Sequence, residues 1–261
     1  MQTLENKKSF TGFNGNQLKL FAIIAMTIDH ITCVLWPQIP NYRYEWWIIL
    51  LHLIGRLTAP TMWFMVAEGY QHTRNVKKYA GRLFIFAIIS HFAYNFAFGI
   101  PFIPLKTGIF NQTSVMWSLA WAVVLLVVLD EERCKFPVFV KILITFAICV
   151  ITFPSDWSCI AVISIMYINH NYGNLKNQII SMMGCVLMYS IVWFLCIDKV
   201  YAFVQLGVII VLPFIANYNG QRGTWKGMKW FFYLYYPLHL VLVGFLRLAL
   251  HGNVGMIIGG R

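Results

Sequence analysis

Charged residues are scarce in this sequence. Only 11% of its 261 residues are Asp, Glu, Lys or Arg, whereas a soluble domain carries about 25%. Hydrophobic residues make up 59% of the chain, and the mean hydropathy is +0.67. This composition excludes an ordinary soluble globular protein and indicates that most of the chain faces lipid or other apolar helices.

Acidic residues are rarer still, with 9 against 20 basic residues and a formal net charge of +11. Such a balance can indicate a nucleic-acid partner. Here the basic residues lie in short stretches between apolar runs and do not gather on a soluble module. The charge therefore indicates membrane topology, and no nucleic acid is expected.

Several catalytic signatures are missing. The chain has no Walker phosphate loop, GxGxxG, HExxH or GxSxG pattern, which leaves little support for ATP-driven pumping or for hydrolase chemistry of the known motif classes. Its six cysteines show no CxxC spacing and lie mostly within apolar segments. They are expected to be buried small side chains, and no metal site is predicted.

Long apolar runs, by contrast, fill the chain. A polar lead-in, residues 1–17, precedes nine of them: 18–36, 46–71, 79–98, 113–130, 137–153, 157–169, 177–197, 200–216 and 229–250. About 20 helical residues at ~1.5 Å each cross a hydrocarbon core of ~30 Å. We therefore predict an all-α, polytopic integral membrane bundle, a single domain over residues 1–261 with about nine transmembrane segments.

Basic residues set the expected orientation. If the N-terminus is cytoplasmic, 14 of the 20 basic residues fall on its side of the membrane and 5 on the other, with Arg56 inside a segment. The excess predicts a cytoplasmic N-terminus. Six tryptophans near segment ends fit an interfacial aromatic belt. They are Trp36, Trp46, Trp47, Trp117, Trp157 and Trp225.

The pair Asp29-His30 lies in the middle of the first segment. An ionisable residue at this depth costs about 2.5–3.5 kcal/mol on insertion scales and marks a functional site by default. Neighbouring side chains point about 100° apart on a helix. Asp29 is therefore expected to steady a histidine on another helix or to pair with Arg56, whereas His30 is predicted to be a general base.

Three histidines share one expected depth. His30, His91 and His239 each follow a basic residue at the start of their segment by 9 to 11 positions, which places them roughly 14–17 Å into the membrane. A single such histidine is most simply explained by a hydrogen bond to a neighbouring helix. Three at one level favour a shared site.

Polar groups also mark the expected cytoplasmic boundary. Glu68 and His72 are four residues apart and share one helix face, so they form either the start of a route into the bundle or an interfacial ion pair. A dense basic stretch follows at Arg74, Lys77, Lys78 and Arg82. It suits phosphate binding, or it acts as a topology signal that meets anionic lipid.

Three stretches carry a family resemblance. They read LKLFAIIAMTIDH (18–30), LIGRLTAPTMWFMVAEGYQHTRNVKKYAGRLFIFAIIS (53–90) and FYLYYPLHLVL (232–242). Together they resemble the TraX family of bacterial membrane proteins, whose founding member is linked to N-acetylation of a pilin subunit. The family also looks similar to transmembrane acyltransferases that use a membrane-embedded histidine and cytoplasmic acetyl-CoA.

The resemblance implies a multi-pass acetyltransferase of the bacterial cytoplasmic membrane, with acetyl-CoA as donor and an unknown amine or hydroxyl acceptor. The expected catalytic residues are His30, Asp29, His239 and Arg56. The expected substrate-pocket residues are Glu68, His72, His91 and Asn95. Arg74, Lys77, Lys78 and Arg82 are expected to meet the CoA phosphates. Two alternatives stay open: a proton-coupled transporter and a structural membrane subunit whose polar groups bind helices together.

Overall fold

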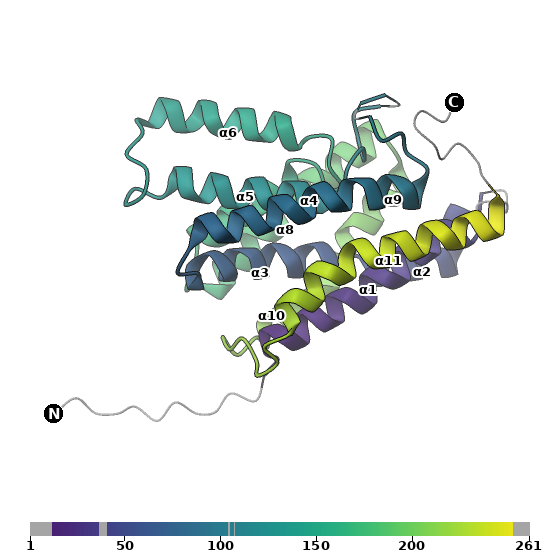
Figure 1. Cartoon of the computed structure of the whole chain (residues 1–261), viewed down its shortest axis with the longest axis horizontal. Helices are drawn as coiled ribbons and strands as arrows, with labels where there is room; N and C mark the ends of the chain where they lie inside the picture. The colour runs from purple at the N-terminus through teal and green to yellow at the C-terminus, as the bar shows by residue number, and fades with distance from the viewer. Residues whose placement is uncertain (1–11, 37–40, 104, 107, 253–261) are drawn as a thin grey trace.

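A computed structural model describes residues 12–36, 41–103, 105–106 and 108–252. Within these ranges the chain is helical and contains no strand. The helices are α1 (Gly15–Leu35), α2 (Trp46–Gly55), α3 (Thr58–His72), α4 (Val76–Phe98), α5 (Val115–Leu129), α6 (Val138–Thr152), α7 (Ile160–His170), α8 (Leu175–Cys196), α9 (Lys199–Gln205), α10 (Leu212–Ala216) and α11 (Met228–His251). Two 3₁₀ turns, Tyr42–Tyr44 and Leu206–Val211, complete the set (Figure 1).

Helices occupy all nine apolar segments expected from the sequence. Six helical stretches are long and apolar enough to cross a membrane: Gly15–Leu35, Trp46–His72, Val76–Phe98, Leu175–Cys196, Lys199–Ala216 and Met228–His251. The helices α5, α6 and α7 are apolar but shorter. The prediction of a multi-pass helical membrane protein is therefore confirmed.

Asparagine and aspartate side chains fix several helix starts. The Asn14 side chain accepts hydrogen bonds from the backbone N–H groups of Asn16 and Gln17, and the Gln17 side-chain oxygen accepts one from the backbone N–H of Asn14. This capping box starts α1 at Gly15, three residues earlier than expected. Residues 1–11 of the predicted lead-in lie outside the described ranges.

The second predicted segment is two helices. It breaks directly after Gly55, as the glycine suggests, and α3 begins at Thr58. Pro60 does not cause a second break, because it lies in the first turn of α3, where a backbone N–H has no intrahelical partner. The break leaves Arg56 at the junction, where its side chain reaches groups on several helices.

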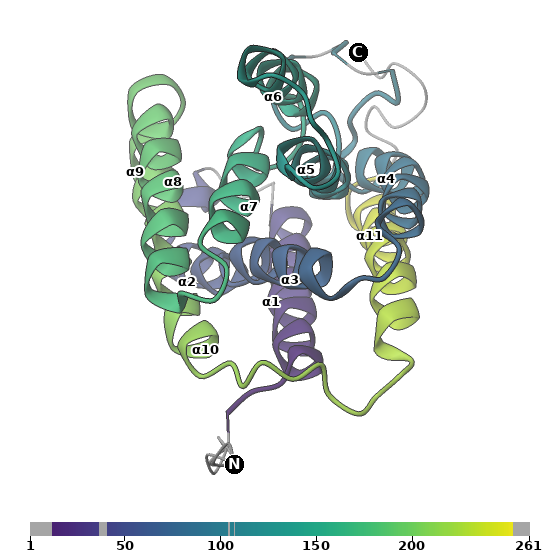
Figure 2. The same ribbon diagram turned by 90° about the vertical axis from the view of Figure 1, so that its left-hand side faces the viewer.

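The central helix of the bundle is α3, in which every residue from Ala59 to Ala67 is buried. It packs on α1, α5 and α7. The helices α1 and α11 lie side by side, α4 packs on α11 and α5, and α6 lies at the periphery against α5 (Figures 1 and 2). This arrangement brings α1, α2, α3, α5 and α11 around one interior region.

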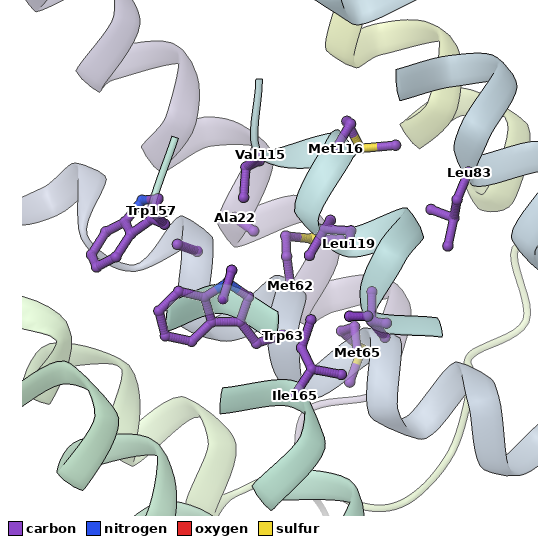
Figure 3. Packing of buried hydrophobic residues seen from close by; sticks show 14 of the residues in the cluster. Ala22, Met62, Trp63, Met65, Leu83, Val115, Met116, Leu119, Trp157 and Ile165 are labelled. Atoms are coloured by element: carbon purple, nitrogen blue, oxygen red, sulfur yellow. The ribbon is translucent and has the colours of Figure 1, made fainter. Parts of the chain in front are cut away.

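One interfacial tryptophan is assigned wrongly from the sequence. Trp157 is only 6% exposed, and its ring packs edge-to-face on Trp63 at 5.2 Å between centroids (Figure 3). It follows the short helix α6 in a turn that folds back into the bundle. Proximity to a segment end therefore did not place this residue at the membrane surface.

Candidate active site

Two of the three mid-membrane histidines meet. His30 on α1 and His239 on α11 are both buried, and His30 Nδ1 lies 2.8 Å from His239 Nε2. The two rings are nearly parallel, with 6° between their planes. The equal depth expected from the sequence is therefore realised as direct contact between two helices that are 209 positions apart.

Partner atoms determine which ring nitrogens carry protons. His239 Nδ1 lies 3.0 Å from the backbone oxygen of Tyr235, which can only accept, so His239 Nδ1–H is the donor. In a neutral ring Nε2 is then an acceptor, and it accepts from His30 Nδ1–H. His30 Nε2 consequently keeps a free lone pair, which is the atom a general base needs.

Asp29 faces a different set of groups. Its Oδ1 accepts a hydrogen bond from His52 Nδ1–H at 2.6 Å and lies 3.6 Å from the Arg56 guanidinium. Both expected roles occur together: Asp29 steadies a histidine on another helix and pairs with Arg56. His52 was missed from the sequence, although its position one helical turn before Arg56, within an apolar run, is a signal that could have found it.

Close packing of α1 on α2 makes this contact. A Cβ atom at Gly55 would lie 2.5 Å from Asp29 Oδ1, so only glycine allows the two helices to approach so closely. Arg56 is also held from other directions. Its Nη1 donates to Gln205 Oε1 at 2.9 Å, and its guanidinium lies 5.3 Å from the Trp157 ring centroid.

A small cavity adjoins these groups. This inner cavity has a volume of about 40 Å³. Its ionisable lining residues include Asp29, His30, Arg56 and Asp156. Its apolar walls come from α1, α3, α5 and α11. Asp156 follows α6 in the same turn as Trp157 and was not singled out from the sequence, because nothing in its neighbourhood resembles a motif.

A second cavity opens at the end of the bundle where α1 and α11 begin and α3 ends. This mouth cavity has a volume of about 380 Å³, within the usual range of ligand pockets. Four basic residues line it: Lys19, Arg82, Arg222 and Lys229. Glu68 and His72 line it too, as a predicted route into the bundle requires, and they also form the predicted ion pair at 3.8 Å.

Arg82 brings an unpaired donor to the lining of the mouth cavity. Its Nε is buried and has no hydrogen-bond partner among the described residues, although a buried donor normally has one. A phosphate group in the mouth cavity would satisfy such a donor.

The two cavities adjoin each other, and we call the side chains that line both of them the neck. Four side chains line both of them: Met62, Met116, Leu119 and Phe232. Lys19 lines the mouth cavity and His30 lines the inner cavity. Both lie on α1, and their 11-residue separation corresponds to about 16 Å. His30 therefore lines an inner cavity that adjoins the basic mouth cavity.

Other predicted residues lie elsewhere. His91 Nε2–H donates to the Phe102 carbonyl at 2.9 Å, and Asn95 Nδ2 donates to the Pro101 carbonyl at 3.1 Å. Both tether the loop after α4, and neither lines the inner or the mouth cavity. The third histidine of the expected trio is thus separate from the other two.

The predicted basic stretch is only partly at the mouth cavity. Arg82 lines it, whereas Arg74, Lys77 and Lys78 are exposed and line neither cavity. The other basic residues that line the mouth cavity with Arg82 are Lys19, Arg222 and Lys229. The sequence alone does not group these three residues with Arg82, because they come from distant parts of the chain.

One group of side chains has the spacing of a metal site. Ligand atoms of Asp29, Cys33 and His52 all lie within 4.8 Å of one another. The carboxylate already accepts from His52 and faces the Arg56 cation. A second cation would meet repulsion from this guanidinium, so the arrangement fits an ion-pair network better than a metal site.

Asp130 lies directly after the last residue of α5, outside the membrane-spanning helices. Its carboxylate accepts hydrogen bonds from Tyr70 Oη at 3.0 Å and from Arg133 Nε at 2.8 Å. Burial by itself raises the pKa of Asp130, but these hydrogen bonds outweigh burial and lower the pKa below its ordinary value of 3.8. The ionised carboxylate therefore joins α3 to the turn after α5.

Comparison with known proteins agrees with the resemblance seen in the sequence. The profile of the TraX protein family matches residues 14–247. The probable fimbrial assembly protein FimC, serogroup H1, of Dichelobacter nodosus is 32% identical over 238 residues, which cover 88% of this chain and 94% of that protein. No solved structure matches the chain. The matched region contains His30, Arg56 and His239 together with the whole lining of both cavities.

Proposed function

Because the chain belongs to the TraX protein family, we propose that it is a membrane-embedded acetyltransferase. It moves acetyl from cytoplasmic acetyl-CoA to an amine or hydroxyl acceptor. The observation that carries the proposal is a basic mouth cavity that adjoins, across an apolar neck, an inner cavity lined by a histidine with a free lone pair. The name of the Dichelobacter relative supports a role in the biogenesis of fimbriae or pili.

The mouth cavity suits the nucleotide end of the donor. Lys19, Arg82, Arg222 and Lys229 supply cationic donors for the phosphates. The pantetheine arm has about the length of four extended peptide units, roughly 14 Å. This is close to the ~16 Å between Lys19 and His30 along α1. Phosphates held in the mouth cavity would thus leave the thioester beside His30.

The inner cavity suits the chemistry. His30 Nε2 takes the proton from the acceptor as its nitrogen or oxygen attacks the thioester carbonyl carbon. Arg56 stabilises the negative charge on the carbonyl oxygen, while Asp29 and His52 hold the guanidinium in place. When the carbon–sulfur bond breaks, His30 returns the proton to the thiolate, and CoA leaves as the thiol. The same lone pair also suits direct attack, with acetyl carried briefly on His30.

The proposal includes an orientation. The N-terminus lies in the cytoplasm, and all nine apolar helical segments cross the cytoplasmic membrane of a bacterium, the three short ones with the help of neighbouring helices. The mouth cavity then opens to the cytoplasm, where acetyl-CoA is made. The positive-inside distribution supports this orientation. Reporter fusions test it: the loop after α3 must report the cytoplasm and the loop after α4 the outer side, and the reverse pair would overturn the orientation.

The decisive experiment compares two membrane histidines. The protein is purified in detergent, and CoA thiol release and labelled-acetyl transfer to bacterial membranes are measured with His30→Ala and the matched control His91→Ala. Loss of activity in His30→Ala alone, with both variants folded, supports the enzyme. Solute uptake into vesicles without any CoA dependence would indicate a transporter instead. If His30→Ala fails to fold and the wild type releases no thiol, a structural subunit is the better description.

A further inference from the structure

The inner cavity is much smaller than the mouth cavity that leads to it, about 40 Å³ against about 380 Å³. We propose that the inner cavity is a size filter for the acyl group of the donor: it admits acetyl and excludes longer acyl chains. Met26 and Val115 set its size. This inference rests on the proposed function and names the residues that limit the length of the donor's acyl group.

The volume matches a two-carbon acyl group. A cavity needs about 10–15 Å³ on this measure to hold one water molecule. At about 40 Å³ the inner cavity has room for a small group but not for a long chain. An acetyl group has three non-hydrogen atoms, whereas a butyryl group has five. Each methylene beyond acetyl thus has to displace packed side chains.

The walls are firmly held. Met26 is 3% exposed and Val115 is 8% exposed, and both line only the inner cavity. Val115 begins α5, directly beside the neck residues Met116 and Leu119, and Met62 faces them from α3 (Figure 3). Met26 and Val115 face no second cavity, so close packing limits how far these two side chains can move.

Hydrogen bonds fix the start of α5 as well. The Ser118 hydroxyl bonds the Ser155 hydroxyl and donates to the Ser158 carbonyl at 3.1 Å. The turn at Trp157 and Ser158 has positive φ angles of 63° and 50°, which residues other than glycine rarely adopt. The turn persists because packing holds it, so the wall behind Val115 does not yield easily to a longer acyl group.

The test compares binding of three thioesters to the purified full-length chain: acetyl-CoA, propionyl-CoA and butyryl-CoA, with free CoA as reference. One surplus methylene in a packed pocket costs about 10- to 200-fold. The wild type is therefore expected to bind acetyl-CoA at least about tenfold more tightly than butyryl-CoA. Met26→Ala and Val115→Ala are expected to reduce this ratio severalfold by enlarging the cavity.

Matched controls separate enlargement from general loosening. Met182→Ala and Val123→Ala remove the same side chains from equally buried positions, 1% and 0% exposed, that line neither cavity. They are expected to keep the wild-type ratio. Equal affinity of the wild type for acetyl-CoA and butyryl-CoA, or a ratio reduced as much in the controls, would overturn the size filter. Failure of all four ligands to bind, free CoA included, would instead refute the proposed function itself.

Discussion

The hydrogen bond between His30 and His239 predicts which ring nitrogen of His30 carries the proton. His239 Nδ1–H is committed to the Tyr235 carbonyl, so His239 Nε2 accepts from His30 Nδ1–H over 2.8 Å. His239→Leu removes that acceptor and leaves the proton of His30 without a partner. The ring of His30 is then expected to move its proton to Nε2, which removes the lone pair that the reaction needs.

The magnitudes follow from burial of the pair. A buried donor that loses its acceptor costs about 1–3 kcal/mol of stability. A positioned general base contributes about 10²- to 10⁴-fold to a rate. His239→Leu should therefore lose on the order of 100-fold in acetyl transfer. His239→Gln keeps a side-chain carbonyl that can accept from His30 and should stay within about tenfold of the wild type, roughly 1.4 kcal/mol.

Two measurements check this reasoning. Nitrogen chemical shifts of labelled histidine in the detergent-solubilised protein distinguish the protonated ring nitrogen from the bare one, and CoA thiol release gives the rate. His91→Leu serves as the control, since this histidine only tethers a loop. A bare Nδ1 on His30 in the wild type, or equal rates for His239→Leu and the wild type, would refute the assignment.

Three further predictions concern packing, donor binding and acid stability. Gly55→Ala forces a Cβ atom to within 2.5 Å of a carboxylate oxygen and should destabilise the protein by about 1–3 kcal/mol in thermal unfolding. Gly81→Ala, with open space around its Cα, should be neutral or more stable by about 0.5–1 kcal/mol; equal losses in the two variants would contradict this. Lys19→Ala should raise KM for acetyl-CoA by roughly tenfold with little change in kcat. Lys78→Ala should change neither, and the reverse result would move the phosphate site to the start of α4. Because the folded-state pKa of Asp130 is lowered, its stabilising contribution is present above about pH 4 and is lost as pH falls through the folded-state pKa. In Asp130→Asn the fluorescence-detected stability should show a smaller loss between pH 4 and pH 2 than in the wild type, and equal losses would disprove the role of this carboxylate.

The helical segments could be predicted from the sequence alone. Apolar runs of membrane length predicted every helical segment, because backbone groups in lipid must be satisfied within a helix. A fixed rise per residue placed His30 and His239 at one depth, and these two histidines do meet. The same rise gave His91 a similar depth, yet it binds the Phe102 carbonyl in a loop.

Only the tertiary structure decided which side chains face one another, because rise per residue gives depth but neither the direction of a side chain nor the neighbour of a helix. His52 reaches Asp29 because Gly55 lets α1 and α2 approach closely. The mouth cavity likewise joins Lys19 and Arg222, from opposite ends of the chain, whereas basic residues adjacent in sequence point to solvent. Hydropathy and spacing predicted where the helices lie along the chain, and packing between helices selected the few groups that form the site.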